Sequence, residues 1–366
     1  MGIPEKIKAI EEEMARTPVN KGTERHLGVL KAKIARLKAQ MEFNAVKKAA
    51  AGGGDGYTVK KDGDATIVLL GLPSVGKSTL LNHLTNSKSK VGAYDFTTLT
   101  VIPGILKYRG ARIQVLDIPG IIRGASKGRG LGKRILSATR SADLIIVLTD
   151  VFNPGIKEVL LNEIRAIGLR PDELPPDIQV RRRGSGGIHV TDLVGMTKMS
   201  ADGVKEILRE YKMHNGRVVV REDVSYDQLI DVMMKNRLYV PTLTVLNKID
   251  MVDEEYLTEI KEKHNLDTIN ISADNDINLD GLKEAIFQQL DLIRLYMKPR
   301  GEPADMEEPL IIRKGSTILD ITDKIHRNLR DELRYTRIWG KSVKFGGQKV
   351  SRTHRPMDED IITFFT

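Results

Sequence analysis

Residues 71–78 read Gly71-Leu72-Pro73-Ser74-Val75-Gly76-Lys77-Ser78. This stretch fits the pattern G-x-x-x-x-G-K-[ST], the loop with which one large class of nucleotide hydrolases holds phosphate groups. An apolar run at 65–70 precedes it and a helix-like run that begins with Thr79 follows it. In that order of strand, loop and helix, backbone amides and a helix N-terminus meet the phosphates. We therefore predict an α/β fold in which Lys77 reaches the β- and γ-phosphates and Ser78 binds Mg²⁺.

A second motif, Asn247-Lys248-Ile249-Asp250, indicates the base. An aspartate accepts hydrogen bonds from both N1–H and the exocyclic amine of guanine, a pair of donors that adenine does not offer. Ser272 and Ala273 follow the strand-like run 268–271, and we predict that they form the loop at the edge of the base. Together the motifs predict a protein that binds GTP and GDP.

Two further stretches lie between these motifs. Asp117-Ile118-Pro119-Gly120 follows a strand-like run, and there an acidic residue holds Mg²⁺ through water while a glycine lets a backbone amide approach the γ-phosphate. On its own this tetrapeptide would indicate only a turn. Upstream, Phe96-Thr97-Thr98 is the candidate first switch, where a threonine completes the Mg²⁺ shell. Three threonines, of which the third is Thr100, compete for that role.

The residue after Gly120 is Ile121, where many signalling GTPases carry the glutamine that orients the attacking water. One interpretation is that Ile121 only packs. The other is that hydrolysis depends on a bound cation, a partner or a switch residue. We expect slow intrinsic turnover, on the order of 10⁻⁴ to 10⁻² per second by analogy with unassisted small GTPases.

Length and composition narrow the class of protein. A chain of 366 residues suggests two to four domains, and a formal charge of +9 favours a polyanionic partner. The absence of cysteine excludes a disulfide scaffold and cysteine-ligated zinc. No signal peptide and no apolar run of transmembrane length is visible, so we expect a cytoplasmic protein with no membrane partner.

The domain boundaries follow from spacing. We predict an N-terminal helical hairpin at 1–50, a nucleotide-binding domain at 60–295 ending in a helix at 282–296, and a β-grasp domain at 298–366 that includes a strand at 342–345. About 90 residues separate the strand ending at 150 from the one beginning near 240, far more than a parallel sheet needs, which predicts an inserted α+β subdomain at 165–237.

Basic residues outside the motifs allow two interpretations. In the hairpin, Lys31 and Lys38 lie opposite an apolar seam with heptad-like spacing, and they form either a solvated face or an arm that meets RNA. In the insertion, Arg181, Arg182 and Arg183 form either a solvated hairpin tip or a contact to a phosphate backbone.

The chain resembles the developmentally regulated GTP-binding proteins of archaea and eukaryotes, within the Obg-like GTPases, and we expect an archaeal member. The resemblance spans essentially the whole length. It rests, besides the motifs above, on Glu13-Met14-Ala15-Arg16-Thr17, on His26-Leu27-Gly28 with Leu30-Lys31-Ala32-Lys33, and on the region from Lys344 to Asp360.

The resemblance implies a helical N-terminal region, a GTPase domain with an inserted subdomain, and a C-terminal TGS domain of β-grasp fold. It also implies hydrolysis of GTP with Mg²⁺ and an association with translating ribosomes or RNA. The second threonine of the Phe-Thr-Thr switch, here Thr98, would ligate Mg²⁺ and serve catalysis with Lys77 and Gly120. Some relatives use K⁺ as an activator that an asparagine of the loop ligates. Ser74, a weaker ligand, stands at that position here, and K⁺ dependence stays open.

Three functions follow as hypotheses. The leading one is a GTPase whose nucleotide state controls binding to ribosomes or RNA, acting as a monomer with an accessory regulatory protein as a further partner. The alternative is a scaffold that binds ribosomes or RNA, with a structural nucleotide and negligible turnover. An ATPase is the third, and the intact Asn247-Lys248-x-Asp250 motif argues against it.

Overall fold

The computed structural model describes residues 2–50, 62–85, 102–118, 139, 141–235, 237–264 and 267–366. The chain divides into two compact units, each of which is described by itself. The first unit joins Met1–Gly56 to Gly168–Tyr239, and the second joins Tyr57–Ile167 to Val240–Thr366. No helix in the described part of the chain combines the length and the apolar character that crossing a bilayer requires.

The second unit contains a six-stranded sheet in the order β11-β10-β4-β1-β3-β2. Five of its strands are parallel to their neighbours, and β2 is an antiparallel edge strand. The sheet is therefore mostly parallel, and the prediction of an α/β fold is confirmed. The strands are β1 (Ala65–Gly71), β2 (Ile102–Tyr108), β3 (Ala111–Asp117), β4 (Leu144–Asp150), β10 (Thr242–Asn247) and β11 (Ile269–Asn270).

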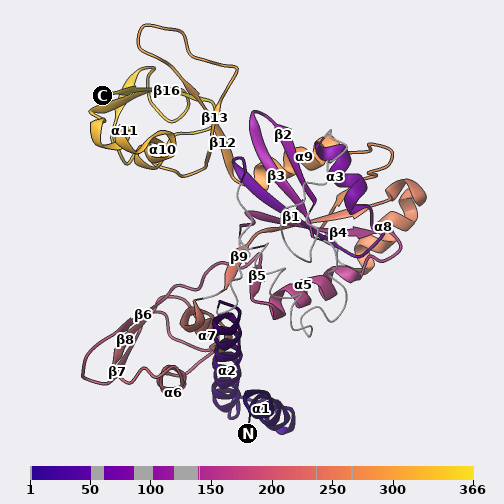
Figure 1. Ribbon diagram of the computed structural model, residues 1–366, viewed down its shortest axis with the longest axis vertical. Helices are drawn as coiled ribbons and strands as arrows, with labels where there is room; N and C mark the ends of the chain where they lie inside the picture. Colours follow the sequence, from indigo (N-terminus) through magenta and orange to yellow (C-terminus); the bar gives the residue numbers. More distant parts are fainter. Residues whose placement is uncertain are drawn as a thin grey trace. The chain divides into compact units, whose positions relative to one another are not determined.

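Helices cover both faces of this sheet, with α3 and α9 on one side and α5 on the other (Figure 1). Because both faces are covered, β1 and β4 are buried along their whole length. Ile67, Leu69 and Ile146 share one apolar core with residues of α3 and α9. The helices and the short 3₁₀ turn are α3 (Lys77–Thr85), α5 (Ile156–Ala166), η2 (Ile249–Met251), α8 (Glu254–Lys263) and α9 (Leu279–Gln289).

A five-stranded sheet in the order β13-β12-β16-β14-β15 forms the C-terminal part of the second unit. Its core contains Ile293, Leu295, Ile338 and Ile362 from the strands, with Ile318 and Ile321 from the first helix. The elements are β12 (Leu292–Met297), β13 (Leu310–Arg313), α10 (Ile318–Ile325), α11 (Arg327–Glu332), β14 (Tyr335–Trp339), β15 (Gln348–Val350) and β16 (Asp360–Phe365).

Two predicted elements in this region are wrong. The helix expected at 282–296 ends at Gln289, and after a turn with a positive φ of 50° at Asp291 the chain enters strand β12. Strand alternation explains the change, because Ile293 and Leu295 must point together into the C-terminal core. The strand expected at 342–345 is a succession of turns, and the strands β14 and β15 lie on either side of it.

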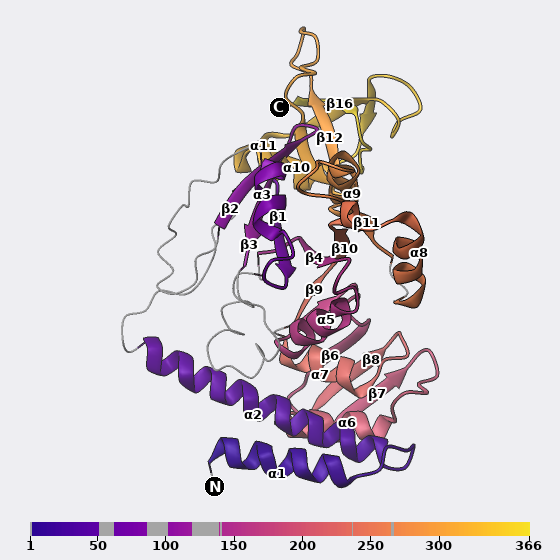
Figure 2. The ribbon, with the colours of Figure 1, turned by 90° about the vertical axis from the view of Figure 1, so that its right-hand side faces the viewer.

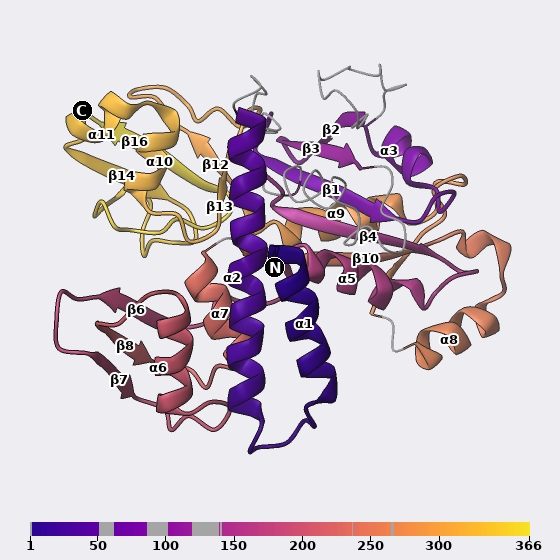
Figure 3. The same cartoon turned by 60° about the horizontal axis from the view of Figure 1, so that its bottom comes forward.

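The first unit packs the N-terminal helices and the inserted segment around one core. Helix α2 lies between α1 on one side and α6 and α7 on the other (Figures 2 and 3). Beside these helices, β8 pairs antiparallel with β6 and parallel with β7. The elements are α1 (Ile3–Arg16), α2 (Glu24–Ala50), β5 (Leu169–Pro171), β6 (Ile178–Arg182), β7 (Ile188–Asp192), α6 (Ala201–Glu210), β8 (Gly216–Val220), α7 (Tyr226–Met234) and β9 (Leu238–Val240).

Helix α2 is apolar on more than the predicted seam. Leu27, Leu30 and Leu37 of the seam are buried. Ala32 is also fully buried, and it lies in the core that the inserted segment forms. Tyr226 packs so closely on α2 at Gly28 that a Cβ there would lie 2.8 Å from its ring. The N-terminal helix thus completes the hydrophobic core of the insertion.

Candidate functional site

The loop 71–78 connects the end of β1 to the start of α3 and has a strained backbone. Gly76 has a φ of 96°, in the left-handed region, and a Cβ built there would lie 2.3 Å from the side-chain nitrogen of Asn247. Only glycine fits both constraints. Ser74 also has a positive φ, of 62°. The loop is therefore fixed by close contact with the second motif, which lies more than 160 residues further along the sequence.

Lys77 begins helix α3, and its ammonium group lies under the loop. The Nζ atom donates to the carbonyl oxygens of Gly71 at 3.0 Å and Leu72 at 2.7 Å. Burial lowers the pKa of Lys77, and the nearby carboxylate of Asp117 opposes that shift. A buried cation that is held only by carbonyl oxygens is suited to an anionic ligand.

Ser78 and Asp117 meet at the same end of the sheet. The hydroxyl of Ser78 donates to Oδ2 of Asp117 at 3.3 Å, while Oδ1 is buried without a hydrogen-bond partner among the described residues. Burial raises the pKa of Asp117, and Lys77 opposes that shift. A buried carboxylate oxygen with no partner next to a hydroxyl oxygen is the kind of donor set that Mg²⁺ prefers, so these residues fit the ion.

Asn247, at the end of β10, ties three segments together. Its Nδ2 donates to the carbonyl of Val75 at 2.9 Å, and its Oδ1 accepts from the amide of Ala273 at 3.0 Å. The side chain is 1% exposed, so both bonds are shielded from water. Asn247 therefore holds the phosphate loop and the predicted base-edge loop in a fixed arrangement.

Lys248 adopts a left-handed conformation and reaches back over the loop. Its Nζ donates to the carbonyl of Ser74 at 2.9 Å and lies 3.0 Å from Oδ2 of Asp150. The ring of Phe152 lies 5.6 Å from the same nitrogen. The aliphatic stem of Lys248 is thus held in one orientation, which suits it to pack against the flat face of a base.

Asp250 lies in the 3₁₀ turn η2 and is exposed. Its Oδ2 accepts a hydrogen bond from the side-chain amide of Asn275 at 2.9 Å. Asn275 in turn donates its backbone amide to the hydroxyl of Ser272. The carboxylate is therefore oriented by the loop that carries Ser272 and Ala273.

Two apolar members of the motifs serve packing. Ile118 is 1% exposed, and Ile249 packs against the cluster of Val151, Leu246 and Ile260. The remaining predicted residues of the switches, Phe96, Thr97, Thr98, Pro119, Gly120 and Ile121, lie outside the described residues.

The sequence did not single out three residues that take part in this arrangement. Asp150 holds Lys248, Phe152 lies against the same ammonium group, and Asn275 holds Asp250. Asp150 could have been found, because it ends β4, which pairs with β1 and β10 at the edge of the sheet where the loops gather. Asn275 carries no such signal in the sequence.

The predicted RNA contacts in the first unit differ in their surroundings. Lys31 pairs with Asp227 at 2.6 Å and Lys38 with Glu11 at 3.7 Å, so an acidic partner is present for each. The arginine triplet is divided by strand alternation. Arg182 points to the helix side, where it donates to the carbonyl of Tyr211, and Arg181 points to the opposite face.

The opposite face of this small sheet is basic. Arg181 lies in register with Arg217 of β8, and Arg217 lies in register with His189 of β7. All three side chains are exposed, whereas Val218, next to Arg217, is fully buried on the helix side. The open face therefore carries two arginines and a histidine from three neighbouring strands.

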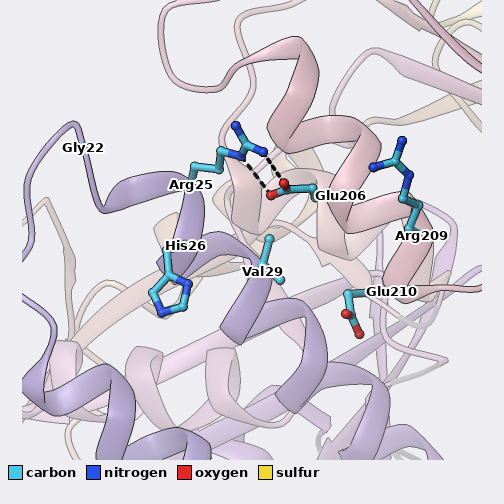
Figure 4. Close-up of a pocket in the computed structure, with 7 residues that line it drawn as sticks. All are labelled: Gly22, Arg25, His26, Val29, Glu206, Arg209 and Glu210. Atoms are coloured by element: carbon cyan, nitrogen blue, oxygen red, sulfur yellow. Dashed lines mark hydrogen bonds and ion pairs between the residues drawn. The ribbon is translucent and has the colours of Figure 1, made fainter.

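A hollow of about 490 Å³ lies between α2 and α6 (Figure 4). Two of its charged groups pair with each other, since Nε of Arg25 donates to Glu206 at 2.8 Å, and Glu210 lies 3.5 Å from Arg36. We assign it no ligand. Among the described residues, no group of three or more His, Cys, Asp or Glu side chains could hold a metal ion.

Three family models match consecutive parts of the chain. Residues 66–180 match the model of a 50S ribosome-binding GTPase, residues 185–292 match the C-terminal region of that domain, and residues 293–366 match the TGS domain. The third match begins at β12, the strand that belongs to the C-terminal sheet.

Curated relatives align over the whole length. An uncharacterized GTP-binding protein of Methanocaldococcus jannaschii is 50% identical, covering 99% of this chain and 93% of its own. GTP-binding protein 1 of Schizosaccharomyces pombe is 43% identical with full coverage of both chains. Human developmentally-regulated GTP-binding protein 2 is 42% identical, covering 99% of each.

Among solved structures, the YchF GTPase of Schizosaccharomyces pombe is similar with a TM-score of 0.44 and 14% identity, covering 84% of this chain and 99% of its own. A GTP-binding protein from Pyrococcus horikoshii is similar with a TM-score of 0.41 and 14% identity, covering 82% and 99%.

Proposed function

The chain belongs to the family of developmentally regulated GTP-binding proteins, and from that premise we propose that it hydrolyses GTP to GDP and phosphate with Mg²⁺ and that its nucleotide state controls binding to ribosomes or RNA. The observation that supports the first part is the convergence on Asn247. One side chain joins the phosphate loop at Val75 to the base loop at Ala273. A phosphate site and a guanine site are therefore held at a fixed separation by one buried residue.

We assign the phosphates to Lys77 and the amides of the loop. The Nζ of Lys77 exchanges its two carbonyl acceptors for phosphate oxygens, which are stronger acceptors because they are charged. Glycine at position 76 lets the loop take its left-handed turn directly against Asn247, since a Cβ there would lie 2.3 Å from Nδ2 of Asn247.

Ser78 and Asp117 would hold Mg²⁺, the serine directly and the aspartate through water. When bound, the ion neutralises charge on the β- and γ-phosphates. Asp117 must be ionised to hold the ion. Because its pKa is raised, it needs a higher pH for ionisation than an exposed aspartate does. The hydrolysis experiment below tests whether a K⁺ ion acts near Ser74.

The base is assigned to guanine through Asp250. Asn275 fixes one of its oxygens, and the carboxylate as a whole is exposed at the mouth of the site. Asp250→Asn should weaken GTP binding on the order of 10²-fold, because two hydrogen bonds to a charged acceptor are lost or reversed. Asn275→Ala is the matched variant. It removes only the orienting bond and should weaken binding about threefold to tenfold.

Ribosome or RNA binding is supported by less direct observations. The family model matched over 66–180 is that of a 50S ribosome-binding GTPase. The chain carries a formal charge of +9, and the open face of the inserted sheet presents Arg181, Arg217 and His189. A basic face of this kind is suited to a phosphate backbone.

The deciding experiment measures steady-state GTP hydrolysis by the purified protein in Na⁺ and in K⁺, with and without ribosomes from its own source. Stimulation by ribosomes supports the switch and places the missing catalytic help in the partner. Stimulation by K⁺ alone places that help in the nucleotide site. Tight GTP binding with turnover that no condition raises would favour the scaffold instead, and equal competition by ATP would exclude the guanine assignment.

A further inference from the structure

Strands β2 and β3 form a hairpin that runs from the candidate nucleotide site to the opposite end of the sheet. Seven residue pairs join the two strands, beginning with Ile102 opposite Asp117. A two-residue turn closes the hairpin, and in it Arg109 and Gly110 have positive φ values of 49° and 82°. Turns of this kind match the twist of the strands that they connect. Because the pairing has no interruption, the hairpin is a stiff element roughly 20 Å long.

One end of the hairpin lies at the candidate Mg²⁺ site. Asp117, the last residue of β3, accepts the hydrogen bond from the hydroxyl of Ser78. In the sequence the two candidate switches flank the hairpin, with Thr98 before β2 and Gly120 after β3. A change that the γ-phosphate causes in either switch therefore acts on a chain that enters or leaves this hairpin.

The other end of the hairpin packs against the C-terminal domain, residues 293–366. A Cβ at Gly110 would lie 2.4 Å from Cγ and 2.9 Å from Cδ of Pro309, the residue before β13. Ile311 of β13 is 3% exposed and shares the core of the nucleotide domain with Leu106 of the hairpin. The next residue, Ile312, lies in the C-terminal core. Strand β13 therefore faces one core on each side.

Helix α9 holds the same turn from a second direction. The guanidinium of Arg109 lies 2.8 Å from the carboxylate of Glu284, and the hydroxyl of Tyr108 donates to that carboxylate at 2.9 Å. The ring of Phe287 meets Tyr108 edge-on, with centroids 6.1 Å apart. Strand β12 follows α9 and enters the C-terminal sheet. Closely packed contacts of this kind transmit a displacement instead of absorbing it.

Two ion pairs attach the C-terminal domain to the middle of the sheet. Lys324 of α10 pairs with Asp64, just before β1, at 3.2 Å, and Arg313 of β13 pairs with Asp143, just before β4. Strands β1 and β4 are central, whereas the hairpin supplies the edge strand β2. The C-terminal domain therefore contacts both the centre of the sheet and the hairpin that ends at the switches, so a shift of the hairpin relative to the centre changes how the domain is held.

We propose that the β2–β3 hairpin couples the nucleotide to the C-terminal domain, so that the contact between Gly110 and Pro309 differs between the GDP and GTP states. This coupling rests on the proposed function, in which the nucleotide state controls a partner, and it adds the route through the chain. The nucleotide shifts the hairpin at its Asp117 end, and the packed turn passes the shift to Pro309. Coupling is reciprocal, so a change at Pro309 alters the relative affinities for the two nucleotides.

The first experiment compares the full-length protein with Mg²⁺ and GDP and with Mg²⁺ and the slowly hydrolysed analogue GTPγS. Hydrogen exchange is followed by mass spectrometry in a peptide that covers β13 and in one that covers β15. We expect exchange in β13 to differ about threefold or more between the two states, as a local change in opening produces. Exchange in β15 should be the same, because that strand lies at the far edge of the C-terminal sheet.

Two substitutions test whether the contact at the turn carries the coupling. Gly110→Ala places a methyl group against the ring of Pro309, and Pro309→Ala removes the two ring atoms that the methyl group would meet. Each should change the ratio of the dissociation constants for GDP and GTPγS about fivefold or more. The double variant should return the ratio to within about twofold of the wild type, because the added methyl group takes the space of the ring.

Gly315→Ala is the matched control. Gly315 has a φ of 85°, close to that of Gly110, and no described atom lies within 4 Å of a Cβ built there. The substitution imposes similar backbone strain without the contact, so the ratio should stay within about twofold of the wild type. Thermal unfolding shows which variants are folded. The exchange experiment uses the wild type alone, so it tests the coupling even when a variant does not fold.

The outcomes separate this coupling from the proposed function. Equal exchange of β13 in the two nucleotide states overturns the coupling even when ribosomes stimulate GTP hydrolysis. So does a ratio that Gly110→Ala and Gly315→Ala change equally, or additive effects in the double variant. Exchange that differs in the wild type, together with a ratio that recovers in the double variant, establishes the coupling even when ribosomes leave hydrolysis unchanged, in which case the proposed role at the ribosome fails instead.

Discussion

In the second unit, the residues of the candidate site come from four separate segments, and each segment follows a strand of one sheet: Lys77 after β1, Asp117 at the end of β3, Asn247 at the end of β10 and Ala273 after β11. In the first unit, one core is assembled from α2, between residues 29 and 35, and from the inserted segment between residues 178 and 234. In the second unit, a short motif lies at or after the end of each of these four strands. The first unit carries no nucleotide-binding motif, and its core is held together by packing.

This difference explains why the nucleotide site could be predicted from the sequence and the packing of the first unit could not. The carboxyl ends of parallel strands meet at one edge of a sheet, so a short polar motif after each of several apolar runs predicts a shared site. Helix α2 and the inserted segment pack together through Ala32 and Tyr226, and in the sequence these residues look like any other apolar positions. Periodicity shows that such residues are buried, and it does not show what buries them.

The largest expected effect tests the second unit. Lys77→Ala should lower the rate of GTP hydrolysis about 10²- to 10³-fold, the usual cost of removing one donor that stabilises charge in a transition state. Its Nζ donates only to backbone carbonyls in the described structure, so the fold should persist. Single-turnover hydrolysis together with thermal unfolding measures both quantities.

Lys324→Ala is the matched control, because that lysine pairs with Asp64 at 3.2 Å outside the site. It should leave turnover unchanged. Equal turnover in Lys77→Ala and the wild type would show that the loop is not the catalytic phosphate site.

The second effect tests the first unit. Ala32→Asp places an unpaired carboxylate in a core where Ala32 is fully buried, and it should destabilise that unit by about 3 kcal/mol or more. GTP affinity should stay within about twofold, because the predicted site residues lie in the other unit. Hydrogen exchange of amides in α6 and α7 measures the loss.

Ala9→Asp provides the comparison, since Ala9 is exposed on α1. It should cost only a few tenths of a kcal/mol, the difference in helix propensity. Exchange rates in α6 and α7 that are the same for both variants would mean that α2 does not stabilise the insertion.

Much of the fold could be predicted because the strands of the six-stranded sheet are nearly continuous apolar runs next to turn-forming motifs. The error at 282–296 has a physical cause. Ile286, Leu290 and Ile293 are spaced as on one face of a helix, yet Leu290 packs in the core of the nucleotide domain and Ile293 in the core of the C-terminal sheet. Local spacing cannot distinguish one core from two neighbouring ones.

The candidate site shows the same limit at the level of single residues. The motifs gave Asn247 and Asp250, whose roles follow from hydrogen-bonding capacity alone. Asn275 was missed because its role depends on a turn that brings its side chain within 2.9 Å of Asp250. The triplet 181–183 looked like one basic patch, and strand alternation divides it between two faces.

A smaller effect concerns Asp117. Its folded-state pKa is raised by burial, so between the ordinary aspartate value and the raised value the folded chain holds more protons than the unfolded chain. Stability of the nucleotide-free protein therefore falls as the pH rises through that window. Asp117→Asn should remove this dependence and raise the melting temperature at neutral pH by a few degrees while abolishing Mg²⁺-dependent turnover. A lower melting temperature for the variant would contradict the buried, unpartnered carboxylate.

The smallest effect compares two tyrosines within the first unit. The hydroxyl of Tyr226 accepts a hydrogen bond from the amide of Ser200 at 3.1 Å, whereas the buried hydroxyl of Tyr211 has no partner among the described residues. Tyr226→Phe should therefore lower the free energy of unfolding by about 1 kcal/mol, and Tyr211→Phe should raise it by about 0.5 to 1 kcal/mol. Urea unfolding at neutral pH measures both changes.

The pH dependence separates these two tyrosines further. Burial raises the pKa of Tyr211 from 10.0 to about 12, so between these values the unfolded chain loses a proton that the folded chain keeps. Wild-type stability then decreases as the pH rises from about 10 to about 12, and Tyr211→Phe should decrease less steeply because it lacks that group. Parallel curves of stability against pH for the wild type and Tyr211→Phe would contradict this prediction. They would show that the hydroxyl of Tyr211 forms a hydrogen bond in the folded chain.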